Sequence, residues 1–461
     1  MSALPRGWVV APLVEVCELI QDCEHRTPEY SDTGVPALRP RDVVGGRLNL
    51  EAAARVVQSE YELQTRRYAP VPGDVAYSRE LSLGWAAKLP AAQVCLSQGM
   101  VALKPGSVVA DYLVHFLNGP GRAHAVGAQA GSAHPHLNLR DIRALPLPVA
   151  PLAEQERIVA AIEEAFSKLN AGEAGLRTAR QLLKRMREAV LAAAVTGRLV
   201  PQDPADTPAT KLLADLGIQS QRADGLPGGW AHARIGDIAR VGSGTTPNRG
   251  SSDYWVGGSV PWITSGQVTA GVIREAREFV TVKALDETSL RMWPAGTLLV
   301  AMYGEGQTRG RCAELAIGAT CNQACAAIAL PDGMRNYGRF VRLYFDANYS
   351  VNRKLASGGV QPNLNAGLIK DMLIPLPPFN EQERIVGEVD RQLSFIEACD
   401  RAIDAGLVRS AALRRSVLKA AFEGRLVSQD PLDEPASVLL ERIRDERLTA
   451  PSSKRRARQS A

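Results

Sequence analysis

The chain has 461 residues, of which 45% are hydrophobic and 22% are charged, with a formal net charge of +5 and a pI near 8.8. This length allows two to four domains, and the composition is that of a globular protein. The sequence has no run of 18 apolar residues and no apolar core of a signal peptide at its start, so we expect a cytoplasmic protein without membrane spans. The mild positive charge is compatible with DNA binding over a limited surface.

Two regions, residues 1–150 and 226–377, have the pattern of mixed α/β (α+β) domains. In the second region, β-branched runs such as Ser259–Thr264 and Thr297–Met302 alternate with glycine, proline and asparagine turns, which predicts short strands. Each region is entered by a similar segment, Leu4–Trp8 in the first and Leu226–Trp230 in the second.

A long helical segment follows each of these regions, at residues 151–200 and 378–427. An apolar heptad frame runs from Ile158 to Ala193 and returns in weaker form from Ile385 to Ala420. A 3.5-residue repeat sustained over this length indicates a coiled coil, so we expect the two helices to pack antiparallel on each other. About 40 residues at 1.5 Å each give a rod of roughly 60 Å.

The remaining segments are connections. Residues 201–225 are expected to form a linker that contains a short apolar helix, and Gly197 lies where a helix C-cap is expected. Residues 428–461 are expected to form a short helix and a basic tail, which begins after Leu448.

The two halves of the chain are copies of one unit. The string Glu154–Val159 returns 227 residues later as Glu381–Val386, and Gly197–Val200 returns with the same spacing as Gly424–Val427. Such a repeat predicts an internal pseudo-twofold object. Duplex DNA is the commonest partner with near-twofold symmetry, so the repeat favours a DNA-binding protein.

Motifs of catalysis are missing from the sequence. It contains no Walker A loop, no strand–GxGxxG–helix arrangement and no Asn-Pro-Pro-aromatic loop of an adenine methyltransferase. The seven cysteines include no CxxC pair, which predicts free thiols instead of a zinc site. His134–His136 occupies the place that Gln361–Asn363 has in the other copy, so a polar loop contact is favoured over metal ligation.

The duplicated order of these motifs resembles the specificity subunits of type I restriction-modification systems. The residues that carry the resemblance are Pro151–Val159, Pro378–Val386, Leu38–Asp42, Val260–Thr264, Thr246-Pro247, Tyr254-Trp255 and Asn322-Gln323. The resemblance extends to about residue 445. The first copy departs from the commoner pattern at His134–His136 and at Leu96–Gln98.

The resemblance implies two target recognition domains, each of which reads one half of an asymmetric bipartite DNA sequence. The paired helices would set the gap between the halves and dock two modification (methyltransferase) subunits, which restriction subunits with helicase and nuclease activity join. S-adenosylmethionine would then bind the methyltransferase subunits, and ATP and Mg the restriction subunits. This chain would bind double-stranded DNA, hold no cofactor or metal and catalyse no reaction.

Candidate DNA-binding residues are polar side chains in loops between the expected strands. The arginine fork suits guanine or phosphate, amides suit adenine edges, and a tyrosine could stack on a base or contact phosphate. They are Arg39, Arg41, Arg79 and His134 in the first domain, and Tyr303, Gln307, Arg309, Arg311, Gln361 and Asn363 in the second. The candidates for partner docking lie at the helix starts: Glu154, Gln155, Arg157, Ile158, Glu381, Gln382, Arg384 and Ile385.

Three alternatives stay open on the residues. The first is a duplicated coiled-coil scaffold that binds no DNA. The second is a complete nuclease-methyltransferase enzyme, against which the missing cofactor motifs count. The third, within the same family, is the specificity subunit of a defence system that methylates without cutting.

Overall fold

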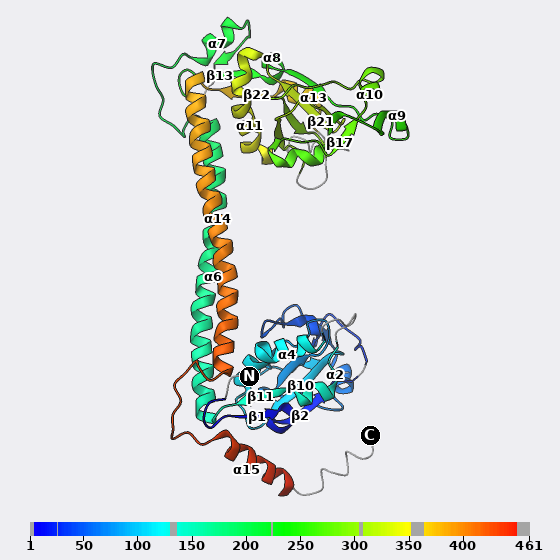
Figure 1. Cartoon of the computed structure of the whole chain (residues 1–461), viewed down its shortest axis with the longest axis vertical. Helices are drawn as coiled ribbons and strands as arrows, with labels where there is room; N and C mark the ends of the chain where they lie inside the picture. Colours follow the sequence, from blue (N-terminus) through cyan, green and yellow to red (C-terminus); the bar gives the residue numbers. More distant parts are fainter. Residues whose placement is uncertain are drawn as a thin grey trace. The chain divides into compact units, whose positions relative to one another are not determined.

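The computed structural model of the chain describes residues 4–24, 26–129, 136–222, 225–303, 308–351 and 364–449 (Figure 1). It consists of two compact units, one formed by Met1–Leu176 with Asp404–Ala461 and the other by Arg177–Ile403. Each unit contains one mixed α/β domain and parts of two long helices, which is the predicted fold class. No helix in the described ranges is long and apolar enough to cross a membrane.

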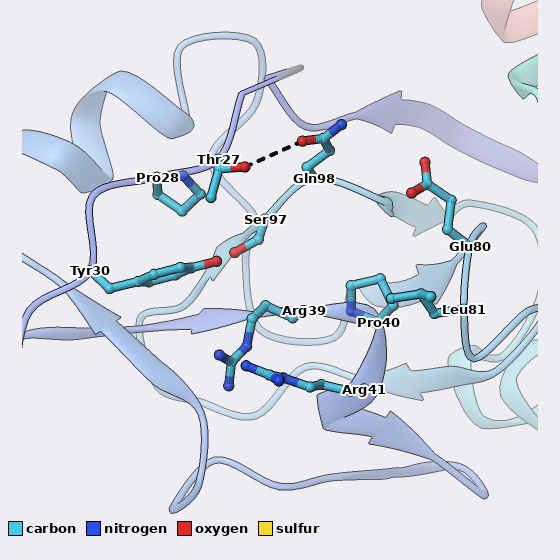
Figure 2. A pocket seen from close by; sticks show the side chains of 10 residues that line it. All are labelled: Thr27, Pro28, Tyr30, Arg39, Pro40, Arg41, Glu80, Leu81, Ser97 and Gln98. Atoms are coloured by element: carbon cyan, nitrogen blue, oxygen red, sulfur yellow. Dashed lines mark hydrogen bonds between the residues drawn. The ribbon is translucent and has the colours of Figure 1, made fainter.

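The first unit contains a four-stranded antiparallel sheet and a smaller three-stranded sheet. The larger has the order β2-β10-β7-β8 (Cys17–Asp22, Met100–Pro105, Val75–Ser78, Ala86–Lys88), and the smaller has the order β6-β3-β9 (Ala54–Val56, Val35–Leu38, Cys95–Leu96). Strands β3 and β9 run parallel, and the loops after β3 and β7 line a common pocket (Figure 2). Two strand pairs complete the unit, β1 (Val9–Pro12) with β11 (Pro146–Val149) and β4 (Val43–Val44) with β5 (Arg47–Leu48).

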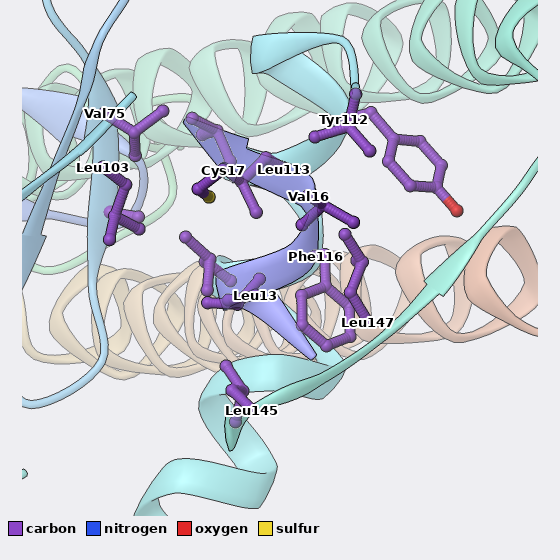
Figure 3. Close-up of a cluster of buried hydrophobic side chains, with 14 of the residues drawn as sticks. Leu13, Val16, Cys17, Val75, Leu103, Tyr112, Leu113, Phe116, Leu145 and Leu147 are labelled. Carbon is purple, nitrogen blue, oxygen red and sulfur yellow. The ribbon is translucent and has the colours of Figure 1, made fainter. Parts of the chain in front are cut away.

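Short helices pack on both sheets, and a core closes against the long helices. The helices are α1 (Leu13–Val16), η1 (Pro40–Asp42), α2 (Gln58–Gln64), α3 (Ala110–Asn118), α4 (Pro120–Ala128) and α5 (Leu139–Ala144). Leu13 and Leu113 are fully buried in this core (Figure 3). The rings of Tyr112 and Phe116, both from α3, lie 4.9 and 5.4 Å from that of Phe422, so the domain is packed onto the end of the second long helix.

The second unit has a similar topology with additional strands at the edges of two sheets. Its sheets have the orders β14-β21-β18-β19-β16 (Arg240–Ser243, Cys325–Ala329, Leu298–Ala301, Cys312–Leu315, Val272–Ile273), β17-β15-β20 (Glu278–Val280, Val260–Ile263, Thr320–Cys321) and β12-β13-β22 (Gln221–Arg222, Ala231–Arg234, Leu373–Leu376). Its shorter helices are α7 (Ala209–Asp215), α8 (Ile235–Ile238), α9 (Ser252–Trp255), η2 (Ser265–Ala270), α10 (Val282–Glu287), η3 (Asp332–Tyr337), α11 (Gly338–Ala347) and α13 (Ala366–Asp371). Strand β15 pairs parallel with β20, as β3 does with β9. The predicted strands near residues 260 and 298 and the helix in the linker are confirmed.

The two long helices are α6 (Leu152–Val195) and α14 (Phe379–Phe422), with 44 residues each. In the first unit Glu173 accepts a hydrogen bond from Ser410 (2.7 Å), and in the second unit Arg180 pairs with Asp400 (2.8 Å). Residue numbers rise along one helix as they fall along the other, so within each unit the helices pack antiparallel. Most positions of the predicted heptad frame are buried or half-buried; Gly172, Met186 and Leu413 are exposed.

Both long helices end in the same way. Gly197 and Gly424 each have φ +67°, and the N–H groups of Arg198 and Arg425 donate to the carbonyls five residues earlier at 2.9 and 2.8 Å. This is the Schellman motif, in which glycine is favoured because it has no Cβ. A Cβ at Gly197 would also lie 2.5 Å from Cγ of Pro227, so a proline of the repeated entry segment closes over the helix end. The predicted cap at Gly197 is confirmed.

A short helix follows the second long helix, α15 (Ala436–Thr449). The N–H of Ala436 donates to Gly7 O (2.9 Å), as the N–H of Ala209 donates to Gly229 O (2.7 Å) in the other unit. The basic tail lies outside the described residues. The limits predicted for the separate domains remain predictions.

Candidate nucleic-acid interface

A pocket of about 370 Å³ lies between the polar loops of the first domain (Figure 2). Its lining consists of Thr27, Pro28, Tyr30, Arg39, Pro40, Arg41, Glu80, Leu81, Ser97 and Gln98. The hydroxyl of Ser97 is buried and has no hydrogen-bond partner in the described part of the chain. A buried polar group without a partner favours a site that a ligand or water completes.

Arg39 and Arg41 both line this pocket, but within the described residues only Arg39 of the two is hydrogen-bonded to another side chain. Arg39 donates from Nε to Asp42 Oδ2 (2.9 Å) and lies over the ring of Tyr30 at 5.7 Å. The hydrogen bond to Asp42 raises the pKa of the Arg39 guanidinium. Arg41 is exposed and forms no ion pair within the ranges that the structure describes. Arg41 is therefore the arginine of this pair that is free to reach a base edge or a phosphate.

Arg79 is mostly buried, with 12% of its side chain exposed, and it contacts His136 and Glu80. Its Nη2 donates to His136 Nε2 (3.0 Å), which leaves the proton of the neutral ring on Nδ1, 3.2 Å from Glu80 Oε1. The predicted role of Arg79 as a direct base reader stays untested. In the structure its guanidinium positions His136 and, through it, the Glu80 carboxylate at the pocket rim.

The candidates of the second domain are only partly described. Tyr303 follows β18 with 37% of its surface exposed, and the Arg311 guanidinium lies 4.1 Å from the ring centroid of Tyr349. Arg309 is half-buried. Four further predicted DNA-binding residues lie outside the described residues: His134 of the first domain, and Gln307, Gln361 and Asn363. A second cavity, of about 410 Å³, is lined by eight residues between Gly266 and Arg277, among them Arg274.

One polar contact occurs in both domains. In the first, Thr27 Oγ1 donates to Gln98 Oε1 at 3.4 Å, and in the second Thr246 donates to Gln323 in the same way. Each threonine precedes a buried proline, and each glutamine follows the strand that runs parallel to β3 or β15. The bond uses the amide oxygen of each exposed glutamine, so the N–H₂ group remains as the donor that could meet another molecule. The Thr-Pro pair that occurs in both copies, Thr27-Pro28 and Thr246-Pro247, is the sequence signal for this contact.

The predicted docking residues at the helix starts make contacts inside each unit. Glu154 accepts from Trp8 Nε1 (3.0 Å), and Arg157 pairs with Asp433 (2.6 Å). In the second unit Glu381 accepts from Trp230 Nε1 (3.0 Å), and Arg384 pairs with Asp206 (2.5 Å). We call Trp8, Glu154, Arg157 and Asp433 the first clasp, and Trp230, Glu381, Arg384 and Asp206 the second clasp.

The amides and isoleucines of the motif are also used internally. Gln155 accepts from the N–H of Val109 (2.9 Å) and donates to Ala150 O (2.8 Å), and Gln382 donates to Asn336 O (2.7 Å). Both isoleucines, Ile158 and Ile385, are fully buried. Of the eight residues only Arg157 and Arg384 keep more than a third of the side chain exposed. Their docking role stays a prediction, and it rests on those two arginines and on the exposed helix faces.

Burial perturbs the two clasp glutamates in the same direction. The pKa of Glu154 and that of Glu381 are both raised, mainly because burial disfavours the charged carboxylate. The adjacent ion pair acts the other way on its own acid, since the hydrogen bond from Arg384 lowers the pKa of Asp206. In the described ranges, no group of three or more histidine, cysteine or acidic side chains could hold a metal ion.

Comparison with known proteins finds similarity to one family. Residues 227–398 match the model of the type I restriction modification DNA specificity domain. The chain is 22% identical over 487 aligned residues to the StySPI specificity subunit of Salmonella potsdam, with 98% of both chains covered. It is 23% identical to the EcoBI specificity subunit of Escherichia coli, covering 97% of this chain and 94% of that protein. Over nearly its whole length the chain is therefore similar to the specificity subunits of type I restriction-modification systems.

Solved structures share the specificity-subunit fold. One comes from work on the assembly and conformational transition of a type I R-M system, with a TM-score of 0.68 and 19% identity, over 92% of this chain and 100% of that one. Another is the HsdS subunit of Thermoanaerobacter tengcongensis, with a TM-score of 0.57 and 19% identity, over 92% and 98% of the two chains. The duplicated α/β domains and long helices therefore form the fold of a specificity subunit.

Proposed function

We propose that this chain is the DNA sequence-recognition subunit of a type I restriction-modification complex, and that each α/β domain reads one half of an asymmetric bipartite target. The observation that carries the proposal is a common fold with different side chains at equivalent loop positions. Exposed Arg41, after β3, corresponds to Gly266 after β15, and Glu80, after β7, corresponds to Tyr303 after β18. Base edges differ in their donors and acceptors, so two loops of one shape with different chemistry suit two different half-sites.

A domain exchange tests independent reading of the half-sites. Residues 230–374 are replaced by the corresponding region of a relative, and the sites methylated by the complete system are sequenced before and after. We expect one half-site to change while the other stays the same. A change in both halves would contradict independent reading.

A duplicated scaffold without a DNA role predicts no salt-sensitive binding to duplex DNA in a titration.

We further propose that α6 and α14 set the number of unread bases between the half-sites. Each has 44 residues, which corresponds to roughly 66 Å at 1.5 Å per residue. The antiparallel contacts within each unit support a stiff pair whose length is set by residue count. Because neither helix belongs to one domain alone, the gap should not depend on which recognition domains are attached.

Opposed insertions test this spacing. Leu176 and Gly406 lie opposite each other, since a Cβ at Gly406 would lie 2.9 Å from Leu176 Cδ1. Adding one heptad beside each keeps the apolar seam and lengthens the pair by about 10 Å, equivalent to about three base pairs. We expect a longer gap with unchanged half-sites. A protein that folds, assembles and still selects the original gap would show that the helices do not set the spacing.

The proposal assigns the chemistry to partners. Two modification subunits would dock on the helices and carry S-adenosylmethionine, and restriction subunits would supply ATP- and Mg-dependent helicase and nuclease activity in the cytoplasm. This chain itself would be non-catalytic. The occurrence of two equivalent helix starts supports a stoichiometry of two modification subunits.

A charge exchange separates docking from folding at these helix starts. In the double variant Arg384→Asp with Asp206→Arg, the internal ion pair is kept but the partly exposed charge changes sign. The same exchange is made at Arg157 and Asp433 in the same protein. We expect this fourfold variant to stay folded but to form less of the two-to-one complex on size-exclusion chromatography. An unaltered complex would place docking elsewhere on the helices.

A further inference from the structure

Leu81 combines two features that cost free energy in the folded chain. It has φ +52°, and it is the single non-glycine residue with positive φ among the residues described by the structure. A left-handed backbone costs a residue with a Cβ about 1–2 kcal/mol. Burial does not compensate for this, because Leu81 is 86% exposed.

The loop around Leu81 is held rigidly by its neighbours. The N–H of Ser78 donates to Trp85 O (2.8 Å), the N–H of Gly84 donates to Ser78 O (2.8 Å), and Ser78 Oγ donates to Glu80 O (2.8 Å). Leu83 is buried, and its carbonyl accepts from Arg122 Nε (3.0 Å). The strained backbone conformation is therefore imposed by its surroundings, and the backbone points the apolar side chain into solvent.

The side chains beside Leu81 have the chemistry of a base-reading surface. Leu81 lies on the pocket rim with the Glu80 carboxylate, and the Arg41 guanidinium lines the same pocket (Figure 2). A donor, an acceptor and one apolar group therefore occur together. In the major groove, base edges present acceptors and amino donors, and their apolar group is the thymine methyl.

We propose that Leu81 contacts the 5-methyl group of a thymine in the major groove and so determines one base pair of the half-site read by the first domain. The inference rests on the proposed DNA-reading function of this domain. Strain at an exposed residue is retained when the side chain has a use outside the folded chain. Because the backbone at Leu81 is already held by its neighbours, binding costs little further backbone entropy, which suits the residue to this contact.

The test pairs a methyl deletion in DNA with removal of the side chain. After the target is identified by sequencing methylated DNA, each thymine of the first half-site is replaced in turn by deoxyuridine. The complete chain with its modification subunits is then titrated with each duplex. We expect one replacement to weaken wild-type binding about fourfold, the effect of losing one buried methyl group. Leu81→Gly should bind the two duplexes equally.

Two controls separate recognition from stability. Leu81→Gly should leave the melting temperature unchanged or raised, because glycine adopts positive φ without strain. Val44→Ala truncates another exposed apolar side chain of the same domain and should keep the wild-type response to deoxyuridine.

Several results would overturn the inference. A first half-site without an A·T pair, or with no deoxyuridine position that weakens binding, excludes a thymine contact. If deoxyuridine still weakens the binding of Leu81→Gly, the methyl contact belongs to another residue. A uniform loss of affinity in Leu81→Gly with unchanged deoxyuridine sensitivity indicates a wedge between base pairs instead. If the wild-type complex binds no specific DNA, the proposed function itself fails, which is distinguishable from all of these.

Discussion

The ion pair of the second clasp should contribute measurably to the unfolding free energy of its unit. The contribution is measured by replacing Arg384 with leucine and Asp206 with asparagine, separately and together. Asp206 has 5% of its side chain exposed, and Arg384 has 37%. The single Arg384→Leu variant leaves a nearly buried carboxylate without its guanidinium. The single Asp206→Asn variant leaves a guanidinium that still reaches water. The two losses should therefore be unequal, and Arg384→Leu should be the more costly.

The geometry sets the size of the effect. Arg384 donates one short bond to Asp206 (2.5 Å) and one long bond (3.3 Å), so about one charge-assisted hydrogen bond is lost. Such a bond contributes about 1.5–3 kcal/mol, and the exposure of Arg384 places it toward the lower end, so we expect about 2 kcal/mol for Arg384→Leu and about 1 kcal/mol for Asp206→Asn. The pKa of Asp206 is lowered in the folded state, so this stability is present above the ordinary aspartate pKa and is lost as the pH falls through the lowered value.

Hydrogen exchange read by mass spectrometry locates the loss. Peptides from residues 202–208 and 379–390 should exchange faster in Arg384→Leu, while peptides around Arg157 and Asp433 should not change. Arg391 serves as the matched control, because it pairs with Glu388 on the same helix while 70% of its side chain is exposed. Arg391→Leu should cost less than Arg384→Leu. Equal losses at Arg384 and Arg391, or a larger loss for Asp206→Asn, would refute the reasoning.

Three further predictions concern buried and exposed polar groups. Burial lowers the pKa of His115 to about 4, so the folded chain should lose up to about 3 kcal/mol of unfolding free energy as the pH falls from about 6.5 to 4. In urea titrations His115→Leu should show a smaller loss over that range, and an equal loss would contradict this assignment. Glu381 has a raised pKa, so its ionisation lowers the unfolding free energy as the pH rises above the ordinary glutamate pKa. Between low and neutral pH, Glu381→Gln should therefore become more stable relative to wild type. Both hydrogen bonds to this carboxylate are accepted by its Oε1, and the amide oxygen of glutamine can accept them as well. A variant that becomes less stable relative to wild type as the pH rises would contradict the prediction. Since the exposed amides of Gln98 and Gln323 recur in domains of different sequence, alanine at both should weaken binding to DNA equally for target and altered half-sites, as expected for phosphate contacts. A loss confined to particular base changes would instead make these glutamines base readers.

The repeat and the periodicities allowed the architecture to be predicted. The heptad frame at Ile158 and Ile385 predicted the seam because burial in an antiparallel helix pair follows side-chain spacing, which sequence displays directly. The cap at Gly197 followed from the conformational freedom of glycine after a helical pattern.

Contacts between distant segments were harder to predict. Arg157 and Arg384 had the pattern of surface docking residues, but each is paired with an aspartate from the segment after the other long helix. A signal existed, because Asp206 and Asp433 recur with the same spacing of 227 residues as the arginines. The left-handed backbone of Leu81 had no such signal, since leucine gives no indication of positive φ, and the burial of Arg79 depends on how loops meet.

The first unit is built from two stretches of chain, Met1–Leu176 and Asp404–Ala461, and the second from one, Arg177–Ile403. During synthesis the second unit has all its residues before the first does, although the first domain leaves the ribosome earlier. At about 5–20 residues per second, the nascent first domain waits roughly 15–60 s for Phe422 and Asp433, which complete its core and its clasp. Over that interval the apolar face of Ile158 and Ile162 lacks the residues of the second long helix that cover it in the folded unit, so it stays exposed until that helix is made.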